Sequence, residues 1–353
     1  MTTQTIKIQS FRIPLLALTG FALFAYFASP ILVPLVSAIF IAFLLSPLVN
    51  LLRKLKFSHT LAVTAVMIFF FVLFVLALWW GAAQLGELAQ KAPQYQLAIA
   101  KALKEFAARL PESVLTYLPF LRDPESWVLS FTTMETAKIA QFAVRGLGSA
   151  ASLFGSVFLI YFLTFFMLLD KDSIQKKLTR FFGRENQTAS AAILQKIGRS
   201  ISVFLVVKTG LSLVLGAVLT VGFLILQIPL PYLWGPLAAI LNWIPYLGSL
   251  VALVLTAIAT LAVHGISWHL PVLMLFFFGA QTLEGNVLEP KLLEKRVDLN
   301  PLAVLLSAIF WAWIWGFVGA LLAVPITAAL KVFCDHVETL QPFGILLASK
   351  KQD

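Results

Sequence analysis

The sequence predicts an all-α, polytopic membrane protein with six spanning helices, two re-entrant or kinked helical hairpins and a small helical extracytoplasmic region. Its 353 residues are 60% hydrophobic and only 12% charged, and their mean hydropathy is +0.93. Soluble domains rarely reach such values. The apolar residues form continuous runs, without the alternation that strands of a membrane barrel require. Because lipid cannot hydrogen-bond backbone groups, such runs indicate helices.

Six apolar stretches have the length of a membrane span, about 20 residues for about 30 Å of hydrocarbon. They cover residues 13–28, 31–52, 61–81, 151–169, 201–226 and 270–288. The first is interpreted as a span and not as a cleaved signal peptide, because Ser29 and Pro30 lead directly into the second apolar run. Two longer stretches, 233–263 and 302–333, contain helix breakers and need a separate interpretation.

The chain therefore divides into five predicted regions. They are N-terminal transmembrane helices (1–81), an extracytoplasmic helical region (82–150), two transmembrane helices with a basic cytoplasmic loop at 170–200 (151–226), a core of two hairpins and one span (233–333) and a cytoplasmic tail (334–353). In the second region, the stretch 97–110 places apolar residues on one helical face, namely Leu97, Ala100, Leu103, Ala107 and Leu110. That face either packs on a neighbouring subunit or the membrane, or folds back on its own domain.

Basic residues in short loops set the orientation, because they prefer the cytoplasmic side. They precede the first span, follow the second and fill the loop at 170–200; the members outside that loop are Lys7, Arg12, Arg53, Lys54 and Lys56. All three loops therefore belong inside, which places the region 82–150 outside. The formal net charge of +10 is spread over these loops, so it marks topology and does not indicate nucleic-acid binding.

The first interrupted stretch, 233–263, is predicted to enter the membrane and return. The segments on either side of it, 227–232 and 264–269, contain no Lys or Arg and should both lie outside, whereas the segment 289–298 has three basic residues and should lie inside. A stretch with both ends outside cannot be a single span. The stretch 302–333 starts inside and ends at cytoplasmic lysines, so the same reasoning applies to it. Two tilted, kinked spans are the alternative.

Helix breakers stand where such hairpins would turn. Pro245 removes a backbone donor and Gly248 weakens the helix in the first stretch. Gly316 and Gly319, with Pro325 beyond them, do the same in the second. The two stretches also begin alike, with the sequences PLAAIL and PLAVLL. Inverted repeats with broken helices that meet near the midplane are typical of secondary transporters.

Several ordered motifs in the last third of the chain resemble the autoinducer-2 exporter family. They occupy residues 236–238, 242–248, 284–291, 299–305 and 316–325. The whole chain is similar to that family in length and hydropathy. One departure is Asn300, where a histidine is common in the family, which puts a proton role for that position in doubt.

The resemblance implies a multi-pass transporter of the bacterial inner membrane that exports the quorum-sensing furanone autoinducer-2 or a similar small polar solute. Members are known to form pentamers and to move a transport part against a scaffold, as an elevator does. Some relatives are reported as sodium/proton antiporters, so a coupling proton or sodium ion is a second expected partner. Membrane lipid is the third, and no nucleic acid is expected.

Few polar groups interrupt the apolar runs, and those few are the candidates for binding or coupling. Gln281 and Glu284 share a helix face, with Asn286 and Glu289 close by. Functionally, that face would bind a hydroxylated solute or carry a proton; alternatively, both glutamates pair with Lys291 or Lys295 at the inner interface. Further candidates lie around the first break: Asn242, Pro245, Tyr246 and Gly248.

Other notable residues receive simpler interpretations. Lys208 is expected to extend its side chain to the cytoplasmic surface. His264 and His269 are expected in an outer loop and not as metal ligands, because no third ligand accompanies them. The tryptophans at 311, 313 and 315 either wall a cavity or mark a membrane interface.

The sequence favours no enzyme class. It contains no phosphate-binding glycine loop, no H-E-x-x-H and no G-x-S-x-G motif, and its single cysteine, Cys334, has no partner for a disulfide or metal site. No cofactor or metal is therefore expected. Three functions remain: export of a small polar solute, cation/proton antiport with Glu284 as the titrating group, and a non-transporting membrane scaffold.

Overall fold

A computed structural model gives the fold of residues 19–108, 110–118, 121–126, 128, 150–182, 187–293, 299–335 and 341–348. The described residues form helices and connecting turns without a strand. The helices are α2 (Ser29–Lys54), α3 (His59–Ala107), α4 (Glu112–Tyr117), α6 (Ala150–Leu169), α7 (Lys171–Phe182), α8 (Gln187–Ile225), α9 (Pro231–Leu241), α10 (Leu247–His264), α11 (His269–Leu283), the π-helix η2 (Glu284–Leu288), α12 (Glu289–Leu293), α13 (Pro301–Asp335) and α14 (Gln341–Leu347). The prediction of an all-α, polytopic membrane protein is confirmed.

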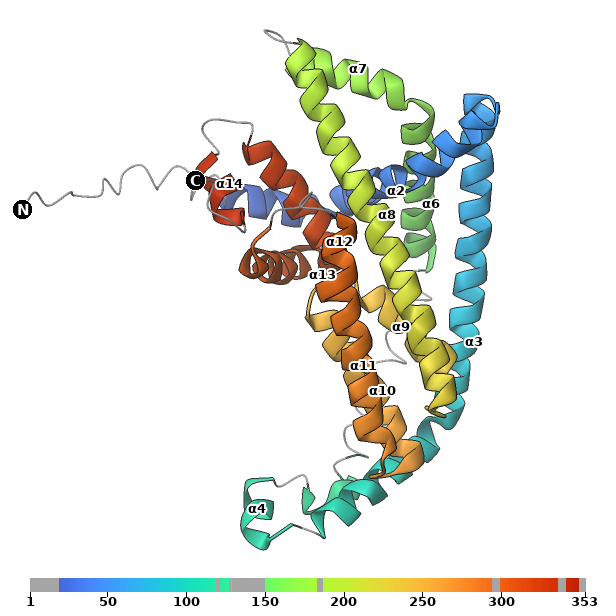
Figure 1. The fold of residues 1–353 in the computed structure, drawn as a ribbon, viewed down its shortest axis with the longest axis vertical. Coiled ribbons are helices and arrows are strands. Elements are labelled where there is room, and N and C mark those ends of the chain that lie inside the picture. The colour runs from blue at the N-terminus through green and yellow to red at the C-terminus, as the bar shows by residue number, and fades with distance from the viewer. Residues whose placement is uncertain are drawn as a thin grey trace, which may run out of the picture.

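The long helices α3, α8 and α11 run along the long axis of the molecule, with α7 across one end and α4 near the other (Figure 1). Six described helices are long and apolar enough to cross a membrane: Ser29–Lys54, His59–Ala107, Gly198–Ile225, Leu247–His264, His269–Leu292 and Pro301–Val332. A further bent pair, Phe154–Leu169 with Lys171–Lys177, joins the set if it counts as one span. Of the first predicted span, only residues 19–28 are described, and 19–27 are helical.

Helix α3 continues well beyond the predicted third span. It begins at His59, where the Ser58 hydroxyl accepts the Leu61 N–H, and it runs without a break to Ala107, through Pro93. No change of element therefore marks the predicted boundary at residue 82. On the predicted apolar face of 97–110, Ala100 and Ala107 are buried, whereas the Leu97 side chain is exposed.

The stretch 233–263 folds back on itself as a hairpin. Helix α9 runs inward from Pro231, the chain turns at 242–246, and α10 returns. The two ends of the hairpin lie close together. His264, at the end of α10, has its Nε2 2.9 Å from the carbonyl oxygen of Gln227, which lies between α8 and the start of α9. His264 also stacks on His269, at the start of α11, with ring centroids 3.8 Å apart. Helices α8, α10 and α11 thus meet at one end.

Helix α13 is also a hairpin, although its hydrogen bonding is nearly continuous. Gly316 takes φ 60° and ψ −143°, a conformation that only glycine adopts without strain, and the chain reverses there. At the tip, the backbone of Gly319 lies directly against the carbonyl oxygen of Trp311. The two ends come together at α14, because Asn300 N–H donates to Leu347 O over 2.8 Å and Asp335 lies against Gly344.

Three apolar clusters hold these elements together, and α8 takes part in two of them. One cluster joins the C-terminal half of α8 to the first hairpin (α9 and α10) and α11. A second joins the N-terminal half of α8 to α2 and the second hairpin (α13), with Trp243 from the tip of the first hairpin packed against it. A third joins α2, α3 and α6. The middle of α8 therefore lies where both hairpin tips approach.

Candidate functional site

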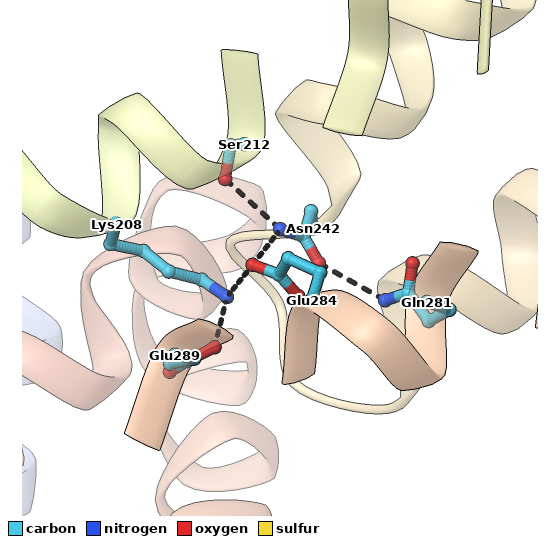
Figure 2. Close-up of polar contacts among 6 residues, drawn as sticks. All are labelled: Lys208, Ser212, Asn242, Gln281, Glu284 and Glu289. Atoms are coloured by element: carbon cyan, nitrogen blue, oxygen red, sulfur yellow. Dashed lines mark hydrogen bonds and ion pairs between the residues drawn. The ribbon is translucent and has the colours of Figure 1, made fainter. Parts of the chain in front are cut away.

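Six polar side chains meet at that position, and we call them the polar cluster (Figure 2). Lys208 and Ser212 come from α8 one turn apart, Asn242 from the tip of the first hairpin, and the others from the end of the α11 segment. The members are Lys208, Ser212, Asn242, Gln281, Glu284 and Glu289. Segments far apart in the chain thus converge inside an otherwise apolar bundle.

An ion-paired triad forms one half of the polar cluster. The Lys208 ammonium lies 3.3 Å from Glu284 Oε1 and 2.8 Å from Glu289 Oε2. Lys208 is 9% exposed and Glu284 4%, whereas the Glu289 side chain keeps 28% of its surface. With one ammonium and two ionised carboxylates, the triad carries a net charge of −1. Because burying charges costs several kcal/mol per ion, each member needs the others.

Asn242 forms the other half and connects three elements. Its Nδ2 donates to Ser212 Oγ over 3.0 Å and to Glu284 Oε1 over 3.1 Å. Its Oδ1 accepts a hydrogen bond from Gln281 Nε2 over 3.1 Å. The tip of the first hairpin is thereby attached to both α8 and α11. A polar solute that entered here would have to replace these bonds with its own.

The π-helix explains why both glutamates face Lys208. In an α-helix, residues five apart point about 140° away from each other, since each residue turns the chain by about 100°. Here the Glu289 N–H bonds to Glu284 O, the i to i+5 pattern of a π-turn, which needs more residues per turn and brings both side chains to one side. Such local widening of a helix occurs frequently at functional sites.

Of the predicted site residues, the structure brings Asn242, Gln281, Glu284 and Glu289 together. Pro245 and Gly248 shape the tip instead, and Gly248 packs against the backbone of Leu241. Tyr246 and Asn286 lie outside the polar cluster. The Tyr246 side chain is 61% exposed, and Asn286 is exposed as well.

The prediction for Lys208 is wrong, and the alternative pairing of the two glutamates with Lys291 is not the one that the structure shows. Lys208 does not extend to a surface; it is buried and paired. Both carboxylates take Lys208 as their partner rather than Lys291, and Lys295 lies outside the described residues. Sequence reasoning also missed Ser212. A usable signal existed for Lys208, because it is the single charged residue of the run 201–226 and a charge in such a run is a functional candidate by default.

The tip of the second hairpin is apolar by contrast. Trp311 is 3% exposed and packs within the second cluster, while Trp313 is 71% exposed. Trp315 Nε1 donates to the carbonyl oxygen of Ala25 over 3.0 Å. Gly316 and Gly319 make the turn, and Pro325 is buried in the returning arm. This hairpin is therefore packed against the N-terminal helix, and none of the six cluster residues lies on it.

A folded-back hairpin joined to a buried polar cluster in an apolar helical bundle is typical of one class of protein, the multi-pass membrane transporters. Comparison with known proteins gives the family. Residues 15–339 match the family described as "AI-2E family transporter", and the chain belongs to it. It is accordingly a transporter and not an enzyme.

Relatives span nearly the whole chain. The AI-2 transport protein TqsA of Escherichia coli (strain K12) is 31% identical over 331 residues, which cover 93% of this chain and 92% of TqsA. YhhT of the same strain is 26% identical over 320 residues, which cover 91% of this chain and 88% of YhhT. Its name assigns it provisionally to transport. A Borreliella burgdorferi protein with a similar provisional name is 26% identical over 328 residues, which cover 92% of this chain and 86% of that protein.

Proposed function

We propose that this protein exports a small polar solute, autoinducer-2 or a similar compound, across the bacterial inner membrane. The observation that carries the proposal is the bonding of Asn242, at a hairpin tip, to both α8 and α11 inside the polar cluster. The name of TqsA supports autoinducer-2 as the first solute to test.

The chemistry of the polar cluster suits a hydroxylated, uncharged solute. Two amides and a hydroxyl offer donors and acceptors in a site where Glu284 is already paired with Lys208. A neutral solute that bonds to Asn242 and Gln281 leaves the ion pair in place, so its entry adds no unpaired buried charge. Its hydroxyl groups exchange one set of hydrogen bonds for another, which costs little when every partner is satisfied again.

Everted membrane vesicles test this proposal. We expect vesicles with the unmodified chain to accumulate labelled autoinducer-2, and we expect Glu284→Gln and Gln281→Ala to abolish the accumulation while the protein remains in the membrane at normal amount. Unchanged accumulation in both variants would remove the site assignment. Absence of accumulation by the unmodified chain would remove autoinducer-2 as the solute.

Cation/proton antiport is the second candidate, because two glutamates share one lysine and leave a net charge of −1. A monovalent cation or a proton would neutralise that excess. A pH-gradient assay on the same vesicles decides the matter. Proton flux that depends on sodium and is lost in Glu284→Gln supports antiport, and its absence excludes it.

The proposal extends to a homo-oligomer, a pentamer by family resemblance, in which the first hairpin and α11 move as an elevator against the static part of the protein.

The third candidate function is a non-transporting membrane scaffold that uses the region 82–150 to recruit partners. It makes the opposite prediction about mutants. Deleting that region would abolish its function, whereas variants of the polar cluster would retain it. Native mass spectrometry of the purified protein tests the subunit number, and a monomer would contradict the pentamer.

A further inference from the structure

Helix α7 separates its polar and apolar residues more strongly than any other described helix of eleven residues or more. Within 171–182 the sequence spaces apolar residues by four and three, at Ile174, Leu178 and Phe181. The same twelve residues contain four basic side chains and one acidic one, a net charge of +3. A short helix of this kind lies at membrane interfaces, with its apolar side toward the acyl chains and its basic residues among the headgroups.

The position of α7 supports the same reading. It follows the apolar helix α6 after one residue, Asp170, and the two axes are bent by 77°. A helix that leaves a span at nearly a right angle runs along the membrane surface. In Figure 1, α7 crosses from the end of α6 to the start of α8 at one extremity of the molecule. Its first residue is fixed to α2, because Lys171 Nζ donates to Ser46 Oγ over 2.6 Å.

A hollow of about 470 Å³ lies between α7 and the start of α8. Its lining combines two basic side chains, one carboxylate and two neutral polar groups: Lys176, Arg180, Asp172, Gln175 and Thr179, with Ala191 opposite. Lys176, Lys177 and Arg180 are exposed. Two exposed cations that line the hollow, with Lys177 next to them in the helix, suit the phosphate of a lipid headgroup.

We propose that α7 lies in the membrane surface and binds the headgroups of anionic phospholipids through Lys176, Lys177 and Arg180. The basic character of the loop 170–200 places this surface in the cytoplasmic leaflet, where anionic lipids attract basic residues. The apolar positions of α7 and its continuity with α6 select lipid over a soluble anion. The lipid site is independent of the transported solute, so it stands or falls apart from the proposed function.

Fluorescence quenching on the full chain in lipid nanodiscs tests the position of α7. In a Cys334→Ser background, a fluorophore is attached to the Ile174→Cys variant, and a second sample carries it on Asp123→Cys, in the exposed part of 121–126. We expect the label at 174 to be quenched by brominated lipid and shielded from aqueous iodide, and the label at 123 to show the reverse. Iodide quenching at 174 without quenching by brominated lipid would overturn the proposal.

Headgroup selection is tested with the label at 174 and two brominated lipids, phosphatidylglycerol and phosphatidylcholine. We expect the anionic lipid to be preferred by at least about fivefold, the factor that corresponds to about one basic residue at an anionic surface. Substitution of Lys176, Lys177 and Arg180 by Gln should abolish the preference. The matched control replaces Lys101, Lys104 and Arg122, which are also exposed, by Gln and should leave it unchanged.

Three results would contradict the lipid assignment. One is equal quenching by both lipids in the unmodified chain. Another is an equal loss of preference in the control variant, which would indicate a general effect of net charge. The last is removal of the preference by inorganic phosphate at constant ionic strength, which would make the hollow a site for free anions. A normal elution profile on size exclusion shows that each variant is folded.

Discussion

The two hairpins share a fold-back geometry and a similar opening sequence, yet their tips are held in different ways. The first tip is held by charges and amides, through Asn242 and its bonds to Ser212, Gln281 and Glu284. The second tip is held by tryptophans, packed in an apolar cluster and bonded to the backbone of Ala25.

This difference suggests a division of labour. Polar bonds can be exchanged for bonds to a solute at little net cost, because each bond lost is replaced by another. Buried aromatic packing has no such replacement, and its disruption costs free energy directly. The first hairpin is therefore suited to respond to a solute, and the second to remain in place.

The largest expected effect comes from Lys208, the buried lysine beside the tip of the first hairpin. Lys208→Met leaves Glu284 and Glu289 without a cation and should lower the free energy of unfolding by about 3–5 kcal/mol. Lys331→Met is the matched change at the second hairpin, where Lys331 is also buried but pairs with Asp335 in the same helix, whose side chain is 31% exposed. Its effect should stay within about 1 kcal/mol. Denaturant unfolding in detergent measures both.

The lysine comparison has an internal control. Adding Glu284→Gln and Glu289→Gln to Lys208→Met removes the unpaired charges and should restore most of the lost stability, because replacing a whole buried ion pair is far less harmful than breaking it. A triple variant as unstable as Lys208→Met alone would show that the triad is not held by its charges.

Intermediate effects are expected from the tip glycines. A Cβ on Gly248 would overlap the carbonyl oxygen of Leu241, and one on Gly319 that of Trp311. Each change to Ala should therefore cost about 1–3 kcal/mol, the usual cost of overpacking. Gly279→Ala is the control, since nothing lies within 4 Å of its Cβ position and Ala favours a helix by up to about 1 kcal/mol. Thermal unfolding should give lower melting temperatures for Gly248→Ala and Gly319→Ala than for Gly279→Ala. Similar melting temperatures in all three variants would contradict the close backbone packing at the two tips.

The smallest effect concerns one hydrogen bond of the second hairpin. Trp315→Phe removes the donor to Ala25 O and should cost about 1 kcal/mol, while transport continues. Trp313→Phe changes an exposed side chain and should stay within about 0.5 kcal/mol. Loss of transport in Trp315→Phe with normal stability would assign this tip a direct part in transport and would contradict the division of labour.

Much of the fold was predictable because membrane topology depends on local signals. Loops without Lys or Arg around 233–263, together with breakers such as Pro245 and Gly316, favoured two hairpins but left two kinked spans as the alternative. The length of α3 was not predictable in this way. The apolar run ends near Gly81, but the helix continues through a less apolar sequence to Ala107. Hydropathy shows where an apolar run ends and not where a helix ends.

The polar cluster was predictable only in part. Gln281 and Glu284 share a helix turn, so their proximity follows from spacing alone. The bond between Lys208 and Glu284 joins residues 76 positions apart, and a single sequence contains no information on that distance. The π-turn that rotates Glu289 toward Lys208 is equally invisible, because its five residues, EGNVL, show no distinctive pattern.

The central claim is that the transported solute binds at the tip of the first hairpin. A matched pair of asparagines tests this claim most directly. Asn242 lies in the polar cluster and Asn286 outside it. We expect Asn242→Ala to reduce the initial rate of autoinducer-2 accumulation in everted vesicles by at least about tenfold, equivalent to about 1.4 kcal/mol, and Asn286→Ala to leave the rate within about twofold. Equal rates in the two variants, at equal protein amounts, would contradict the claim.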